Sequence, residues 1–281
     1  MILFKDSLFS KAPYNRFLEF TSLGVDRFAL LCSVLDECSL VWQTLKIEGK
    51  RHIAVPALPE RSALIFTAHY DRTPQSPGAN DNGAAVFQLI EAALQVKAGQ
   101  NNGKKTVKDR VLFIFTDGEE LSKGESVRCQ GSYGLGLYLK KNGLGNSSIF
   151  SFDACGTGDT LIISTTADQF LKNEKAAGAA ETVRRKVLSL RQKALEAARK
   201  AHLEKVMLLP TPFSEDAGFL LAGMAAQTIT VLPQNEAALV RGNRRLIPET
   251  WKNLNSPGDS PLQLTPEHWK TLSAFADALA K

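Results

Sequence analysis

Short apolar runs alternate with amphipathic segments along most of the chain. The runs are rich in Val, Ile, Leu and Phe, which is typical of strands buried in a parallel sheet. They predict strands at 63–68, 111–116, 148–152, 160–164 and 226–232. Helical spacing of apolar residues predicts helices at 81–96, 132–141, 214–222 and 266–279, the last with Thr265 as its cap. Because strands and helices alternate, we predict an α/β fold with three α/β/α layers and a mostly parallel central sheet.

The first part of the chain departs from this alternation. Apolar positions between 14 and 38 predict a helical layer, and residues 41–57 predict two strands that turn at Glu48-Gly49-Lys50. No internal repeat and no linker rich in Pro, Gly or Ser divides the sequence. We therefore predict a single domain over residues 1–281, in which residues 1–40 form an N-terminal helical layer.

Composition narrows the class of protein. The apolar content of 44 % is that of a globular protein with a sizeable core. The net charge of +5 is concentrated in a predicted basic helix within 167–205, which we interpret as a solvated face, and we predict no nucleic-acid partner. The chain has no apolar run of about 18 residues, so we predict no membrane partner. The N-terminus lacks the basic-then-apolar order of a secretory signal, which indicates a cytoplasmic protein.

Acidic residues and one histidine follow three of the apolar runs, and another acidic residue stands just before the helix at 81–96. They are His69 and Asp71, Glu119 and Glu120, Asp153, and Asp81. The carboxyl ends of parallel strands meet at one edge of a sheet, which is where open α/β folds build their active sites. One imidazole and several carboxylates at such an edge favour a hydrolytic metal centre.

The spacing of these residues suggests a role for each. His69 is expected to bind a metal ion directly, and Asp71 to orient its imidazole. Adjacent side chains diverge at a strand end, so Glu120 can bind metal while Glu119 faces the water as general base. Asp81, in a glycine-flanked turn, can bridge two ions. Taken singly, Asp81 is equally consistent with a helix cap.

The chain resembles the di-zinc aminopeptidase family, which includes bacterial leucyl aminopeptidases, glutamate carboxypeptidase and the glutaminyl cyclases. The resemblance covers most of residues 50–280. It implies a phosphorylase/hydrolase-like α/β fold, with one zinc ion held by His69 and Asp153, another by Glu120, and Asp81 between them. The matching segments are Thr67-Ala68-His69-Tyr70-Asp71, Pro77-Gly78-Ala79-Asn80-Asp81-Asn82-Gly83, Asp117-Gly118-Glu119-Glu120, Phe152-Asp153 and Ser214-Glu215-Asp216-Ala217-Gly218-Phe219.

The resemblance breaks at one expected ligand. Residues 248–259 match a late family segment, but Asn255 stands where that family has a histidine. An amide oxygen is a poorer donor for zinc than imidazole, so we predict Asn255 as a weak ligand and one or two Zn²⁺ per chain. A deliberate replacement of the histidine would give the same sequence. The other histidines, His52, His202 and His268, are expected to be structural or exposed.

Three functions remain open from the sequence. We predict a metal-dependent exopeptidase of aminopeptidase type, which hydrolyses the N-terminal bond of a peptide or small amide with a zinc-activated water and Glu119 as base. The first alternative is a non-catalytic binding or scaffold relative on the same fold. The second is a glutaminyl-cyclase-like enzyme, although the resemblance implies that cyclases need the missing histidine. Loops at 72–76, 121–130 and 234–245 are expected to form the pocket walls.

Overall fold

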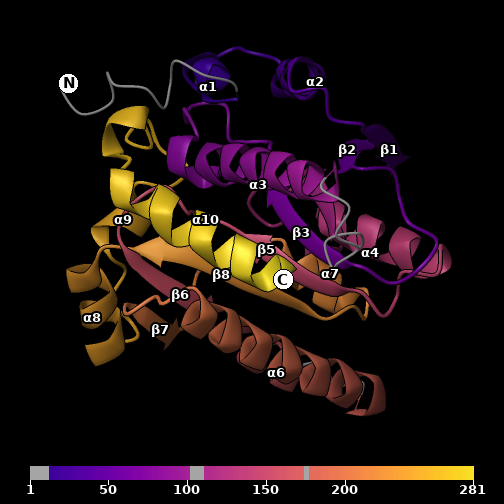
Figure 1. The fold of residues 1–281 in the computed structure, drawn as a ribbon. Coiled ribbons are helices and arrows are strands. Elements are labelled where there is room, and N and C mark those ends of the chain that lie inside the picture. Colours follow the sequence, from indigo (N-terminus) through magenta and orange to yellow (C-terminus); the bar gives the residue numbers. More distant parts are fainter. Residues whose placement is uncertain (1–12, 102–110, 174–176) are drawn as a thin grey trace.

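The computed structural model describes residues 13–101, 111–173 and 177–281. Within these residues a central eight-stranded sheet has the order β1-β2-β4-β3-β5-β8-β6-β7 (Figure 1). Its strands are β1 (Gln43–Ile47), β2 (Lys50–Val55), β3 (Leu64–His69), β4 (Val111–Thr116), β5 (Ser148–Phe152), β6 (Thr160–Ser164), β7 (Val206–Leu209) and β8 (Ala226–Leu232).

The middle of the sheet is parallel and its borders are antiparallel. Strands β4, β3, β5 and β8 run in the same direction, whereas β2 runs against β4 and β6 runs against β8. Thr67 on β3 pairs with Ile114 on β4 and with Ser151 on β5. The carboxyl ends of these three strands therefore lie side by side, and the predicted α/β fold with a mostly parallel sheet is confirmed.

Helices cover both faces of the sheet. On one face α10 (Pro266–Ala280) packs against both α3 (Ala84–Asn101) and α6 (Ala177–Lys200), and these three lie in front of the sheet in Figure 1. On the other face α4 (Gly131–Lys141) packs against α7 (Asp216–Leu221).

Successive strand residues point to opposite faces and enter different cores. Phe66 and Phe113 belong to the larger core beneath α3 and α10. Their neighbours Ile65 and Leu112 belong to a second core, together with Leu135 of α4. Because both faces are buried, these strands are apolar throughout, which is why the sequence predicts them well.

The N-terminal helices are joined to the rest by a buried arginine. They are α1 (Phe17–Phe20) and α2 (Arg27–Glu37), which lie beside α3 in Figure 1. Arg27 is 5 % exposed, and its guanidinium donates to the carbonyl oxygens of Tyr70 at 3.1 Å, Pro77 at 2.6 Å and Gly78 at 2.9 Å. Burial lowers the pKa of Arg27 to about 9. Residues 1–12 of the predicted N-terminal layer lie outside the described residues.

The structure differs from the prediction in a few elements. Strand β7 and the helices α8 (Gln234–Gly242) and α9 (Glu249–Lys252) were not predicted. Helix α10 begins at the predicted residue with Thr265 as its N-cap residue, but the Thr265 hydroxyl makes no capping bond, because it bonds to the backbone of Gly158 instead. Of the helices in the described part of the chain, none is long and apolar enough to cross a membrane.

Candidate metal centre

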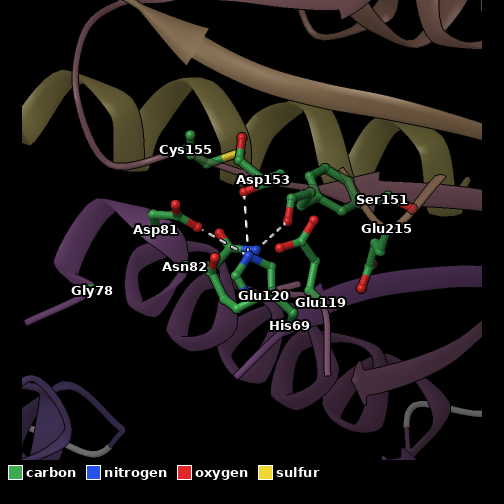
Figure 2. A network of polar contacts seen from close by, with 12 residues as sticks. His69, Gly78, Asp81, Asn82, Glu119, Glu120, Ser151, Asp153, Cys155 and Glu215 are labelled. Carbon is green, nitrogen blue, oxygen red and sulfur yellow. Dashed lines mark hydrogen bonds and ion pairs between the residues drawn. The ribbon is translucent and has the colours of Figure 1, made fainter. Parts of the chain in front are cut away.

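The imidazole of His69 is the centre of a cluster of carboxylates. His69 is the last residue of β3 and is completely buried. Its Nε2 atom lies 3.0 Å from Oδ1 of Asp81 and 3.5 Å from Oδ1 of Asp153. Figure 2 shows these two carboxylates converging on the imidazole, with Glu119 and Glu120 beside it. The structure thus brings together residues that are far apart in the sequence.

Both imidazole nitrogens of His69 lack a hydrogen bond of acceptable geometry among the described residues. A buried polar atom without a partner costs about 1–3 kcal/mol, so a native site is expected to supply one. Burial disfavours the charged imidazole, but Asp153, Asp71 and Asp81 outweigh this and hold the pKa of His69 well above its usual value. The same negative field attracts a divalent cation, so the residues fit a metal ion.

Asp71 connects His69 to the two glutamates. Its Oδ1 atom lies 3.5 Å from Nδ1 of His69, and its carboxylate accepts from the backbone N–H groups of Glu119 at 3.2 Å and Glu120 at 3.0 Å. Although burial opposes it, the contact with His69 and these N–H groups lower the pKa of Asp71. An ionised Asp71 can therefore orient the imidazole, as its predicted role requires.

Glu119 and Glu120 form a second group around the same histidine. Ligand atoms of His69, Glu119 and Glu120 lie within 4.8 Å of one another, as do those of His69, Asp81 and Asp153. Burial, followed by the neighbouring carboxylates, raises the pKa of Glu120 to about 8 and that of Glu119 well above its usual value. The Oε1 atom of Glu120 is buried without a partner among the described residues, so it is also available to a cation.

The turn that carries Asp81 is held by a residue that the sequence did not single out as functional. The Asp259 carboxylate accepts from the N–H groups of Asn80 at 2.7 Å and Asp81 at 3.0 Å. Asp259 is 1 % exposed, and burial raises its pKa to about 6. The side chain of Asp81 faces His69, with Oδ1 3.0 Å from its Nε2 atom. The sequence pointed to Asp259 only in that it is the last residue of the 248–259 segment, which matches a late segment of the family that the chain resembles.

Asn255 lies in the wall of the cavity that Asp81, Glu119 and Asp153 also line. Its side chain is exposed, its backbone has the left-handed φ of 58°, and its carbonyl oxygen accepts from Gln75 at 3.3 Å. Asn tolerates this conformation better than most residues. The role of Asn255 as a metal ligand stays a prediction.

Two other histidines are structural, as expected. His52 and His268 are completely buried, and burial lowers their pKa values to about 4 and about 3 respectively. His52 Nδ1 accepts from the N–H of Asp117, which fixes the start of the segment that carries Glu119. Neither histidine lines the cavity at the centre.

The cavity has a volume of ≈ 220 Å³ and lies next to the carboxylate cluster. Its remaining walls come from residues 211–214, from Thr228 and Thr230 on β8, and from Ala154, Trp251 and Leu254. The predicted pocket loops at 72–76, 121–130 and 234–245 contribute no lining residue, so that prediction was wrong. Residues 234–242 form α8, whose buried side packs into a core of its own with β6, β7 and β8.

A buried glutamate lies behind the centre. Glu215 is 1 % exposed and accepts hydrogen bonds from the hydroxyls of Thr67 on β3 and Thr116 on β4. Burial raises its pKa to about 7. Glu215 therefore connects β3, which ends at His69, with the last residue of β4, three residues before Glu119. The sequence showed only that the segment with Glu215 and Asp216 matches a segment of the family that the chain resembles.

A mostly parallel sheet thus gathers an imidazole and several carboxylates at its carboxyl edge, which is an arrangement that can hold a metal ion. Residues 46–205 match the family model described as peptidase family M28. This match covers more than half of the chain, which therefore belongs to peptidase family M28.

Known proteins resemble the chain in sequence or in fold. It is 29 % identical over 129 residues to the probable lipoprotein aminopeptidase LpqL of Mycobacterium tuberculosis; this is 43 % of the chain but only 24 % of LpqL. The glutaminyl cyclase of Porphyromonas gingivalis superposes with a TM-score of 0.63 at 15 % identity, covering 95 % of this chain and 94 % of that one. The LapA aminopeptidase of Legionella pneumophila superposes with a TM-score of 0.65 at 15 % identity, covering 95 % of this chain and 69 % of that one. The zinc aminopeptidase BSAP of Bacillus subtilis superposes with a TM-score of 0.58 at 21 % identity, covering 82 % of this chain and 49 % of that one. These superpositions show the fold.

Proposed function

We propose that the chain is a metal-dependent aminopeptidase that hydrolyses the N-terminal peptide bond of its substrate. The observation that carries the proposal is the buried His69 imidazole, on whose Nε2 atom the carboxylates of Asp81 and Asp153 converge at 3.0 Å and 3.5 Å. Membership of a peptidase family supports hydrolysis, and the aminopeptidases among the similar proteins support the N-terminal end of a peptide as substrate.

The donor set suits zinc at one position better than at a second. His69, Asp81 and Asp153 would hold one ion, and Glu120 with Asn255 would offer only oxygen donors to another. A bound zinc ion supplies a Lewis acid that polarises the scissile carbonyl and lowers the pKa of water. We therefore propose one firmly bound zinc per chain and a weaker second position.

Glu119 is placed to move the proton. It lines the cavity together with Asp81 and Asp153, which places its carboxylate beside the proposed zinc position. Glu119 takes a proton from the attacking water and then delivers it to the amine that leaves as the C–N bond breaks. Asp71 keeps His69 in orientation throughout.

The charge of the cavity favours an aminopeptidase over a carboxypeptidase. Three carboxylates line it, those of Asp81, Glu119 and Asp153, and the described lining residues include no Lys, Arg or His. A carboxypeptidase has to bind the substrate's terminal carboxylate, and the described lining residues offer it no cationic side chain. The free amine of a peptide N-terminus is complementary to the same surface.

Glu119→Ala tests the proposed function. The zinc-loaded variant is expected to lose hydrolysis of aminoacyl p-nitroanilides while its zinc content stays nearly unchanged, because Glu119 moves the proton and is not needed to hold the first ion. Glu125→Ala is a matched control, since Glu125 is an exposed glutamate a few residues along the same loop. Equal activity in Glu119→Ala and the wild type would rule out Glu119 as the base. An N-acetylated substrate cleaved as fast as the free amine would rule out an aminopeptidase.

A further inference from the structure

The side-chain amide of Gln130 contacts Glu119. Gln130 is 4 % exposed and immediately precedes α4. Its Nε2 atom donates to Oε1 of Glu119 at 3.0 Å, and its Oε1 atom accepts from the N–H of Gly218 at 3.1 Å and from Oγ of Ser132 at 3.3 Å. The sequence placed Gln130 only at the end of a predicted pocket loop, and the resemblance to the family assigned it no role.

The direction of this amide follows from its partners. The backbone N–H of Gly218 is only a donor, so the atom that faces it must be the carbonyl oxygen of the amide. The amino group therefore faces Glu119, and it also lies 3.4 Å from the backbone carbonyl oxygen of Glu119. Oε1 of the Glu119 carboxylate is therefore the acceptor of this hydrogen bond.

Close packing holds Gln130 in place from both sides. The N–H of Gly131 donates to the carbonyl of Gly118 at 2.8 Å, which closes the loop that separates Glu119 from Gln130. A Cβ atom at Gly131 would lie 1.8 Å from the carbonyl oxygen of Asp117, and one at Gly218 would lie 2.1 Å from Oγ of Ser132. Both glycines are needed for this approach, so the amide has little freedom to move away.

We propose that Gln130 is the positioning residue of the general base, and that it fixes Oε1 of Glu119 so that the proton is carried by Oε2. The inference rests on the proposed function. The water proton moves to Oε2 as the water oxygen bonds to the carbonyl carbon. It then moves from Oε2 to the amine nitrogen as the C–N bond breaks. The carboxylate is regenerated, and Gln130 donates to Oε1 throughout without gaining or losing a proton.

This role predicts a kinetic effect that is separate from binding. Without the amide, the Glu119 carboxylate can rotate and share its proton between both oxygens, so a smaller fraction of molecules has Oε2 in the reactive position. Gln130 does not line the cavity, so substrate binding should depend little on it. The effect should therefore fall on kcat and leave KM nearly unchanged.

Gln130→Met tests the inference, because methionine keeps the length of the side chain and removes the amide. We expect kcat to fall by roughly 10- to 100-fold, with KM within about twofold of the wild type. Zinc per chain should be preserved within error, whereas Tm should fall slightly, because the N–H of Gly218 loses its acceptor. Gln88→Met is the matched control: Gln88 is a buried glutamine of α3 whose amide has no partner among the described residues, so its kcat should not fall.

Gln130→Glu separates donation from packing. It keeps an acceptor for the N–H of Gly218 but cannot donate to Glu119 when ionised, so kcat is expected to be at least as low as in Gln130→Met. A wild-type kcat in Gln130→Met would overturn the inference. So would a loss of kcat that is accompanied by an equal loss of zinc and a lower Tm, because this would indicate a purely structural role.

The same series distinguishes this inference from the proposed function. An inactive Glu119→Ala together with a fully active Gln130→Met would overturn only the role of Gln130. An active Glu119→Ala, or a wild-type chain without peptidase activity, would overturn the proposed function and the positioning role with it.

Discussion

The two halves of the candidate metal centre are built in different ways. The first half contains His69, Asp81 and Asp153. A carboxylate oxygen of each aspartate lies within 3.5 Å of Nε2 of the buried His69 imidazole. The second half contains Glu120, which has a buried oxygen without a described partner, and the exposed Asn255. Strand ends and a tightly bonded turn position the first half, whereas a surface turn positions Asn255. Donors anchored in the sheet are held before metal binds, so the first half should bind zinc more tightly.

The largest expected effect comes from breaking the first half. Asp153→Ala should lower zinc affinity by at least about 100-fold and abolish hydrolysis, because it removes a charged ligand from beside a buried imidazole. Glu120→Gln should leave one zinc bound. Elemental mass spectrometry after zinc loading and washing measures both. If Glu120→Gln lost more zinc than Asp153→Ala, the second half would be the one that binds zinc more tightly.

Strengthening the second half should add an ion. Asn255→His is expected to raise the stoichiometry from one zinc per chain to two, because imidazole is a better donor for zinc than an amide oxygen. Asn253→His, two residues earlier on the same surface segment, serves as control and should keep the wild-type stoichiometry. An unchanged count in Asn255→His would mean that position 255 does not face the second ion.

The Asp81 turn gives a smaller effect in the first half. Asp259→Asn replaces one of the two oxygens that accept from the N–H groups of Asn80 and Asp81. The loosened turn should weaken zinc binding by about 10- to 100-fold, as is usual for residues that support a metal ligand. A zinc titration with a competing chelator measures this, with Asp277→Asn near the end of α10 as control. Unchanged affinity would show that the turn is held by other contacts.

The smallest effect concerns Glu215 behind both halves. Its pKa is raised to about 7 from the ordinary 4.5, so between these pH values the folded chain binds more protons than the unfolded chain. Its contribution to stability is therefore present below pH 4.5 and is lost as the pH rises to about 7. Tm measured from pH 5 to pH 8 should fall less steeply for Glu215→Gln than for the wild type. The exposed Glu60→Gln should follow the wild type, and parallel curves for Glu215→Gln would refute the prediction.

The sequence predicted the parts of the molecule that depend on short stretches. Apolar runs buried on both faces located β3, β4 and β5, and the residues that follow them met at one edge of the sheet. Strand β7 was missed although all four of its residues are apolar, because so short a run shows no periodic pattern. The contacts of Asp259, Gln130 and Glu215 were missed for another reason. Each joins segments about 90 to 180 residues apart through one side chain, and local patterns carry no record of such contacts.

Arg27 has a consequence for dividing this protein into parts. Its guanidinium bonds to the carbonyls of Tyr70, Pro77 and Gly78, just before the Asp81 turn. The match to peptidase family M28 begins at residue 46. A fragment cut at that boundary would lose Arg27 and leave these carbonyls without their donor. A fragment that forms the metal centre must therefore include Arg27, which lies before the residues matched by the family model.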